Sequence, residues 1–231
     1  LNDTNIIWIR TNVKMYDTKD LDYFAKNINL LNKEIILITG DSDLNVPSCY
    51  SYNTIITILN NKFVKKWFTQ NYDKSIIHKK LNYYPIGLDL HTTQWLINKD
   101  QLEKISYIIK IRFMNLDRID NKIFCDTHLK FTHIERKLMY ENIKNNIRIN
   151  FSDSLYGFNK IAILYRKHKL VLSPIGNGLD CHRTWELFLL GCIVVTKSSS
   201  LDEMWIKNKL PVVIINDWSD LNFNLKTKIK L

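Results

Sequence analysis

The sequence predicts an α/β protein with parallel sheets, organised in two halves. Short apolar runs alternate with stretches of helical periodicity along the whole chain, which is typical of βαβ units. The 231 residues, 45% of them hydrophobic, are enough for two domains of about 100–120 residues with cores of their own. A polar stretch at Asp117–Lys122 separates two sets of elements of comparable size, so we expect domains at 1–118 and 119–231.

The first half should begin with a strand and a helix. Asn5–Thr11 is a short apolar run, and Asp20–Leu31 carries apolar residues at helical spacing. The Ile-rich run Glu34–Thr39 is typical of a strand that is covered on both faces. The remaining segments of this half are Tyr52–Asn60 and Lys62–Gln70, whose signals are mixed, and Leu81–His91, which reads as a strand running into a Pro/Gly loop.

A second series of strands and helices follows a helix near Asp100–Phe113. It starts with the apolar strand Lys122–Cys125 and the helix Ile134–Asn145. The later elements are strands at Ile147–Phe151 and Lys169–Leu172, a helix at Cys181–Leu190, and strands at Cys192–Thr196 and Pro211–Ile215. We expect the two halves to face each other across a cleft, with ligands at the carboxyl ends of the strands.

The composition excludes several classes of protein. No apolar run reaches the ~18–20 residues of a membrane helix, so we expect no membrane span. The opening residues LNDTNIIWIR show neither the basic nor the apolar region of a secretion signal. Four cysteines without a C-x-x-C pair indicate a reducing compartment rather than disulfides or zinc. These features predict a cytoplasmic location.

The chain is basic. Lys and Arg number 33 against 23 Asp and Glu, a formal charge of +10, which should attract polyanions or phosphorylated ligands. The alternative is a solvated Lys-rich surface without a specific partner. Charge alone suggests nucleic acid, but no recognition motif supports it, so we expect no nucleic-acid partner.

The most informative stretch is Lys169–Thr196, which reads as strand, Gly-containing loop, helix and strand. Ser173, Gly176, Asn177 and Gly178 form a loop that can approach a ligand closely, because two of the four residues lack a Cβ. A helix that starts after this loop points backbone N–H groups into the cleft. That end of the helix is a predicted site for a diphosphate.

The helix after the loop carries the polar groups of the predicted site. We expect Asp180 to be its N-cap and Gly191 its C-terminal stop. Arg183, in the first turn, can donate to phosphate oxygens, and His182 beside it can reach the phosphate or the sugar. Glu186, three residues on, can accept hydrogen bonds from a ribose diol. The alternative is an intrahelical Arg183–Glu186 ion pair.

Residues 173–195, SPIGNGLDCHRTWELFLLGCIVV, followed by LPVVIINDWSDL, resemble the nucleotide-sugar-binding half of exostosin-like glycosyltransferases. The shared pattern is a Pro-x-Gly loop, an Arg-x-x-Glu helix and a Gly-Cys-Ile-x-Val strand. The first half resembles related enzymes of large DNA viruses of algae, and an Asn-, Ile- and Lys-rich composition fits AT-biased viral coding. The residues that carry this second resemblance are Trp8–Arg10, Gly40–Asp43, Trp67–Asn71 and Pro85–Thr92.

The resemblance implies a GT-B fold, in which two Rossmann-like halves bind the donor in the second half and the acceptor mainly in the first. It implies that Arg183 contacts the donor diphosphate and that Glu186 contacts the ribose. It also implies a UDP-sugar as donor and a carbohydrate or glycoprotein as acceptor. The location would then be the host cytoplasm.

Gly40–Asp43 (GDSD) follows an Ile-rich strand and offers two carboxylates, Asp41 and Asp43. An Asp-x-Asp at this place holds a divalent metal in GT-A transferases. A role facing the acceptor is a second possibility, with one carboxylate removing the proton of the acceptor hydroxyl. The third is that the two residues cap a helix or shape a turn.

The loop at 85–91, PIGLDLH, is another candidate for proton transfer. If the backbone is extended, Asp89 and His91 share one face, and His titrates near neutrality. The sequence leaves Asp41, Asp89 and His91 as alternative bases. Arg10 ends the first strand, so it can touch the acceptor or the donor phosphate.

The sequence thus predicts a glycosyltransferase that moves one sugar from a nucleoside-diphosphate sugar to a glycan hydroxyl. The chemistry expected is a single inverting displacement, in which Arg183, loop amides and the helix N-terminus stabilise the leaving diphosphate. Such a site needs no metal, so we expect no obligatory cofactor. The alternatives are a metal-dependent enzyme using Asp41 and Asp43, and a non-catalytic module that binds glycans or polyanions.

Overall fold

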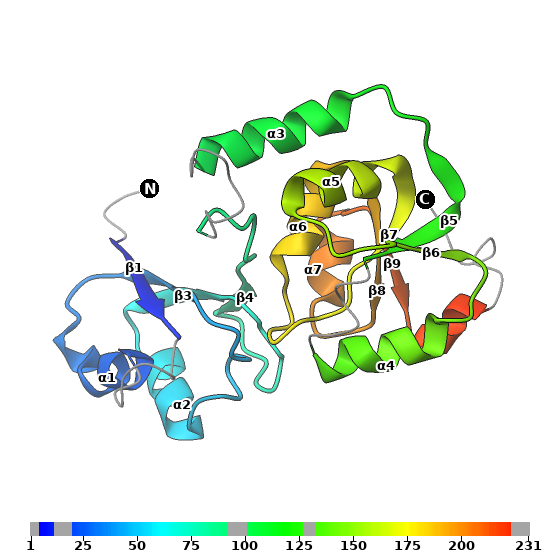
Figure 1. Cartoon of the computed structure of the whole chain (residues 1–231). Coiled ribbons are helices and arrows are strands. Elements are labelled where there is room, and N and C mark those ends of the chain that lie inside the picture. Colours follow the sequence, from blue (N-terminus) through cyan, green and yellow to red (C-terminus); the bar gives the residue numbers. More distant parts are fainter. Residues whose placement is uncertain (1–4, 12–19, 92–100, 127–132, 223–231) are drawn as a thin grey trace. The chain divides into compact units, whose positions relative to one another are not determined.

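The computed structural model of the chain describes residues 5–11, 20–91, 101–126 and 133–222 (Figure 1). It is an α/β structure with two sheets whose paired strands are all parallel, which confirms the predicted fold class. The chain divides into two compact units. The N-terminal unit comprises Leu1–Ile86 with Asn177–Asp180, and the C-terminal unit comprises Gly87–Gly176 with Cys181–Leu231.

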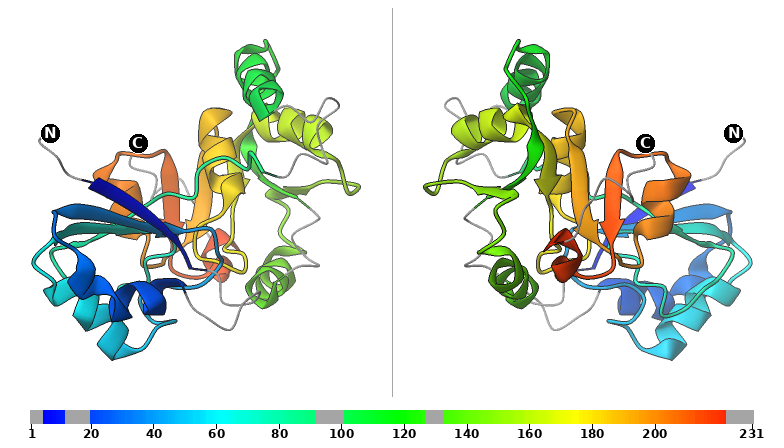
Figure 2. Two further views of the ribbon diagram at one scale, coloured as in Figure 1. Left: turned by 90° about the vertical axis from the view of Figure 1, so that its left-hand side faces the viewer. Right: turned by 90° about the vertical axis from the view of Figure 1, so that its right-hand side faces the viewer.

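The N-terminal unit holds a sheet in which the strands follow one another in chain order, β1-β2-β3-β4. Since parallel crossovers are right-handed, a sheet wound in one direction carries its helices on one face. The helices α1 and α2 accordingly lie on the same side of the strands (Figures 1 and 2). The elements are β1 (Asn5–Arg10), α1 (Asp20–Lys26), η1 (Ile28–Leu30), β2 (Ile35–Gly40), α2 (Tyr52–Asn60), β3 (Val64–Thr69) and β4 (Leu81–Tyr83).

The core of this unit explains the burial along β2. Ile35 and Leu37 are fully buried against Leu21 of α1 and Ile55 of α2, while the intervening residues of the strand are half-buried. Trp67 of β3 is completely buried and donates its indole N–H to Thr39 over 2.9 Å. The indole is therefore accommodated in the core without an unsatisfied donor.

The segment Leu81–His91 is a short strand that runs into a loop, as expected. β4 ends at Tyr83, after which the chain continues irregularly through Pro85 to His91. The amide of Tyr84 still donates to the carbonyl of Thr69 over 2.9 Å, but Thr69 is the last residue of β3, and Pro85 has no N–H to extend the pairing. The result is a loop that presents polar side chains.

The C-terminal unit has a doubly wound sheet in the order β6-β5-β7-β8-β9. The order reverses between β5 and β7, and ligands of such sheets bind outside the carboxyl ends of the strands at this point. The elements are α3 (Gln101–Phe113), β5 (Ile119–Cys125), α4 (Ile134–Ile143), β6 (Ile149–Phe151), α5 (Phe158–Lys167), β7 (His168–Leu172), α6 (His182–Leu189), β8 (Ile193–Lys197), α7 (Asp202–Lys207), β9 (Val212–Ile215) and η4 (Trp218–Asn222).

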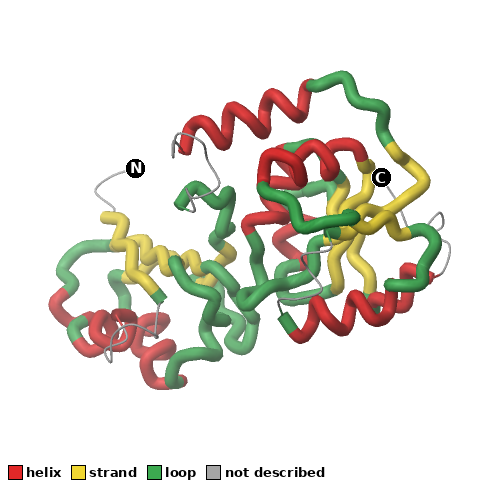
Figure 3. The backbone as a smooth tube through the Cα atoms, viewed as in Figure 1, coloured by secondary structure: helices red, strands yellow, loops and turns green. Residues whose placement is uncertain are grey.

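Helices cover both faces of this second sheet (Figure 3). On β7, Leu172 belongs to the cluster formed with α4 and η4, and its neighbour Val171 belongs to the cluster formed with α3, α5 and α6. Alternate residues thus serve opposite cores, which is why this strand reads as a continuous apolar run in the sequence.

The helix α3 packs in the C-terminal unit, on α5 and α6. Its residues Ile108 and Ile111 are buried in the same cluster as those helices, and Arg112 donates to the carbonyl of Leu189 over 2.8 Å. The units therefore divide at Ile86/Gly87, whereas the sequence suggested 118/119. The polar stretch at 117–122 lies within the C-terminal unit, where it leads into β5.

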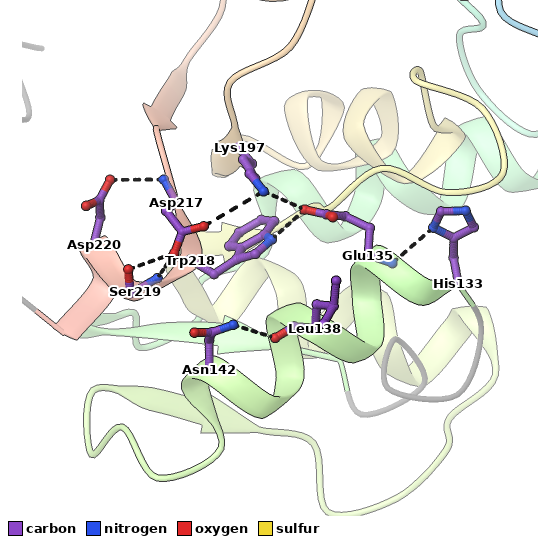
Figure 4. A network of polar contacts seen from close by, with 9 residues as sticks. All are labelled: His133, Glu135, Leu138, Asn142, Lys197, Asp217, Trp218, Ser219 and Asp220. Carbon is purple, nitrogen blue, oxygen red and sulfur yellow. Dashed lines mark hydrogen bonds and ion pairs between the residues drawn. The ribbon is translucent and has the colours of Figure 1, made fainter.

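A polar network ties η4 to the second sheet (Figure 4). Glu135, in the first turn of α4, accepts hydrogen bonds from Lys197 at the end of β8 (3.2 Å) and from the indole of Trp218 (3.1 Å). Lys197 also lies 3.8 Å from a carboxylate oxygen of Asp217. These contacts anchor the last described element to the carboxyl edge of the sheet.

No helix in the described part of the chain is both long enough and apolar enough to cross a membrane.

Candidate functional site

The candidate site begins where β7 ends. The amide of Ser173 donates to the carbonyl of Val195 over 2.9 Å, and its buried hydroxyl shares a 2.9 Å hydrogen bond with the hydroxyl of Thr184 in α6. Ser173 was predicted to belong to a donor-binding loop, and its hydroxyl holds that loop against the helix.

The start of α6 differs from the prediction. Its N-cap is Cys181, without a side-chain capping bond, so the assignment of Asp180 as the N-cap is wrong. The Asp180 carboxylate instead accepts the amide of Ile86 over 2.9 Å. The stop at the other end is confirmed, because Gly191 adopts φ +77° directly after the C-cap Leu190.

The middle of the loop, Asn177–Asp180, belongs to the N-terminal unit. There Asn71 donates its amide to the carbonyl of Ser42 and accepts the amide of Asp180, both over 2.9 Å. A Cβ at Gly178 would stand 2.9 Å from the Asn71 side chain, so any larger residue would displace that side chain. Asn177 is exposed. Asn71 is a positioning residue, and the sequence marked it only as the last residue of the segment Trp67–Asn71 that carries part of the resemblance.

Arg183 is in the first turn of α6, as predicted, and it is anchored by a relay of hydrogen bonds. Its Nε donates to the hydroxyl of Tyr165 over 3.2 Å, and that hydroxyl donates to Asp126 over 3.1 Å. Asp126 directly follows β5, and Arg183 follows β7. The relay therefore joins the carboxyl ends of the two strands between which the strand order reverses. The Nη1 atom of Arg183 is buried and has no hydrogen-bond partner among the described residues.

The surroundings of Arg183 keep it charged. Burial by itself would lower the pKa of the guanidinium, but Tyr165 and Asp126 outweigh this and raise the pKa above its usual value. Burial also raises the pKa of Tyr165, so its hydroxyl stays protonated and continues to donate. A charged guanidinium with an unsatisfied buried N–H is a strong site for an anionic oxygen.

A second arginine lies at the same loop. Arg136 of α4 donates from Nε to the carbonyl of Ile175 over 2.9 Å, and its Nη2 lies 3.7 Å from the sulfur of Cys181. A Cβ at Gly176 would stand 2.8 Å from that Nη2, so the predicted close approach at this glycine serves the arginine. Burial and the charge of Arg183 both lower the pKa of Arg136. No motif in the sequence indicated this residue.

Glu186 is buried and forms an ion pair with Lys104 of α3, whose Nζ lies 2.6 Å from Oε1. The Lys104 side chain is only 5% exposed, donates to the backbone carbonyl of Asp89 over 2.7 Å and lies 4.5 Å from the ring centroid of Phe158. The intrahelical Arg183–Glu186 pair is not among the ion pairs of the described residues, since each has another partner.

Asp89, His91 and His182 gather beside this ion pair. Asp89 Oδ1 lies 3.3 Å from His91 Nδ1, so the two residues share one side of the loop as expected. One side-chain N or O atom from each of the three residues lies within 4.8 Å of the others. His182 Nδ1 is 2.8 Å from the carbonyl oxygen of Gly87. Because a carbonyl only accepts, Nδ1 must carry the proton, which leaves the lone pair of His182 on Nε2.

The remaining predicted residues lie in the N-terminal unit. Asp41, at φ 64°, shapes the turn after β2, and both Asp41 and Asp43 are exposed. Neither caps a helix, since α2 is capped by Ser51. Arg10, at the end of β1, pairs with Asp20 over 3.2 Å.

The structure thus brings together Arg183, Glu186, His182, Asp89 and His91 in the C-terminal unit. No protein-family model matches the chain, and no curated protein matches it in sequence.

Proposed function

We propose that the protein is a glycosyltransferase of the GT-B class that moves a sugar from a nucleoside-diphosphate sugar, preferably a UDP-sugar, to a hydroxyl of a glycan. The observation that carries the proposal is the charged Arg183 at the N-terminus of α6, whose buried Nη1 has no hydrogen-bond partner in the described part of the chain. Arg183 follows β7, next to the point between β5 and β7 where the strand order of the doubly wound sheet reverses. Sheets of this kind bind nucleotides at that point.

The departing diphosphate is stabilised by the groups at the start of α6. The guanidinium of Arg183 and the first amides of the helix donate to its oxygens. Arg136, at the same loop, adds a second positive charge. Glu186 contacts the ribose, and its pairing with Lys104 fixes its position. These charges take the place of a metal, so transfer needs no divalent ion.

The acceptor hydroxyl is deprotonated by His91, positioned by Asp89. The 3.3 Å contact between them favours this pair over Asp41, whose side chain is exposed in a turn of the N-terminal unit. With Nδ1 of His91 directed to the carboxylate, Nε2 receives the proton while the acceptor oxygen attacks the sugar. The displacement is single and inverts the anomeric centre.

The first test is thermal stabilisation by UDP, GDP, CMP and ADP, with and without Mn²⁺. A nucleotide at 100 times its Kd adds about 2.7 kcal/mol to the free energy of unfolding. We expect one diphosphate to stabilise the wild type without metal, and Arg183→Ala to abolish the effect. Arg183→Lys should restore it only in part, because an ammonium lacks the planar fork.

The matched control is Lys207→Ala, which removes a positive charge from an exposed site on α7. It should leave the stabilisation unchanged. If no nucleotide stabilises the wild type, and sulfated glycans bind in a salt-sensitive manner, the proposal fails and the protein is a polyanion-binding module. Loss of the nucleotide's stabilising effect in both Arg183→Ala and Lys207→Ala would show that binding depends only on the net charge of the protein.

A further inference from the structure

We propose that Asp89, His91 and His182 form a binding site for one transition-metal dication of the zinc class, and that its occupation inhibits the transfer reaction. The inhibition rests on the proposed function, whereas the metal site stands on its own. Two imidazoles and one carboxylate are the ligand set that zinc takes in many proteins, with a fourth position for water.

The spacing fits a tetrahedral ion. With metal–ligand bonds of about 2.0–2.1 Å, two ligands of one tetrahedral site are about 3.3 Å apart. Asp89 Oδ1 and His91 Nδ1 are 3.3 Å apart, and a donor atom of each of the three residues lies within 4.8 Å of the others. His91 is exposed to 75%, so its ring can rotate to bring the ligands closer.

His182 is prepared to bind a metal. Its Nδ1–H donates to the carbonyl of Gly87 over 2.8 Å, which fixes the tautomer and the orientation of the ring. Ligating histidines typically donate their other ring N–H to a carbonyl or carboxylate in this way. The rings of His91 and His182 lie 5.2 Å apart, between centroids, so both are near the same point.

The surrounding charges permit a dication. Lys104 lies 3.9 Å from Asp89 Oδ2, but its ammonium is 2.6 Å from Glu186 and is neutralised there. Arg183, next in sequence to His182, is directed to Tyr165. Asp89 therefore provides the negative charge that faces the two imidazoles.

Metal at this site removes the base. A bound ion occupies the carboxylate of Asp89 and a nitrogen of His91, the two groups that deprotonate the acceptor in the proposed reaction. The ion would thus compete with the proton that His91 must accept. Inhibition by zinc together with metal-independent transfer is the expected pattern.

The test is titration of the intact protein with Co²⁺, followed by visible absorption, and with Zn²⁺ by calorimetry. We expect one equivalent and a tetrahedral cobalt spectrum in the wild type, and a loss of affinity of roughly 100-fold or more in His91→Asn and His182→Asn. The control is His133→Asn, the same change at the N-cap of α4, where Asn still accepts the capping bond. It should bind like the wild type.

The assignment is overturned if His133→Asn loses as much affinity as the other two variants, or if the wild type binds no cobalt. Melting temperatures of the variants show whether lost affinity reflects unfolding. A cobalt spectrum without stabilisation by any nucleotide would support the metal site and refute the transferase. Zinc that activates transfer, instead of inhibiting it, would refute the inhibitory role.

Discussion

Lys104 is the residue on which the candidate site depends most and which no sequence pattern marked. It lies on a helix of mixed polarity, and its burial follows only from the packing of α3 on α5 and α6. A buried ammonium is tolerated when it is paired and hydrogen-bonded. Here Glu186 and the backbone of Asp89 supply those partners.

Replacing Lys104 by Met should therefore be strongly destabilising. The change leaves the Glu186 carboxylate buried without its counter-ion, so we expect the free energy of unfolding to fall by about 3–5 kcal/mol. Urea unfolding measures the loss. Lys110→Met, at an exposed position of the same helix, should change stability by less than about 0.5 kcal/mol. Similar losses in both variants would contradict the buried ion pair.

His168 should make stability sensitive to mild acid. Its ring is 1% exposed, with Nδ1 on the carbonyl of Leu164 and Nε2 on the amide of Asn150, so the neutral form is satisfied. Burial lowers the pKa of His168 below the value of 6.5 for an exposed imidazole. The unfolded chain therefore takes up the proton first as the pH falls.

The stabilising contribution of neutral His168 is thus fully present above pH 6.5 and is lost as the pH drops below it. We expect the melting temperature to fall in this range. His168→Gln should lower the melting temperature at pH 7.5 and weaken its dependence on pH between about 5 and 7. An unchanged pH profile in the variant would refute the assignment to this residue.

At the scale of elements, apolar runs located the strands well. All the strands expected in the second half occur, with their first residues displaced by one to three positions and their last residues by at most one. Two helices were missed, α5 and α7, although α5 carries buried residues at Ile161, Ala162 and Tyr165 with helical spacing. The apolar residues Ile163 and Leu164 between these positions hide the helical periodicity in a continuous apolar run, and no side chain caps the start of the helix.

The end of α6 offers a test of an element boundary. Gly191 adopts φ +77°, where an L-residue costs about 1–2 kcal/mol, so Gly191→Ala should destabilise the protein by that amount. The matched substitution is Gly157→Ala, at φ −65° with no atom within 4 Å of the new Cβ. It should change little. Chemical denaturation measures the free energy of unfolding of both variants. Equal losses in Gly191→Ala and Gly157→Ala would contradict the special backbone conformation at Gly191.

At the scale of the molecule, the hydrophobic cores are separate. One cluster is formed by residues of β2, β3, α1 and α2, and two others lie on the faces of the second sheet. Each unit thus has a core of its own, which is the condition for independent stability.

A cavity in one core should therefore destabilise mainly the unit that contains it. Leu37→Ala, at a residue that is 0% exposed, should cost about 2–5 kcal/mol. Hydrogen exchange should accelerate in β1–β4 and remain unchanged in β5–β9. The reciprocal variant Leu172→Ala, also 0% exposed, should show the opposite pattern. Acceleration across both sheets in either variant would mean that the units unfold together.

The fold class, the parallel strands and the places of Arg183, Gly191 and the pair Asp89–His91 could be predicted from the amino-acid sequence. These follow from local causes: apolar runs, helix stops and short spacings along the chain. The packing of the folded chain was needed to show that Glu186 pairs with Lys104, that Asp180 binds the amide of Ile86, and that α3 belongs to the C-terminal unit. These contacts join residues far apart in the chain, and burial, which no local pattern records, selects the partners.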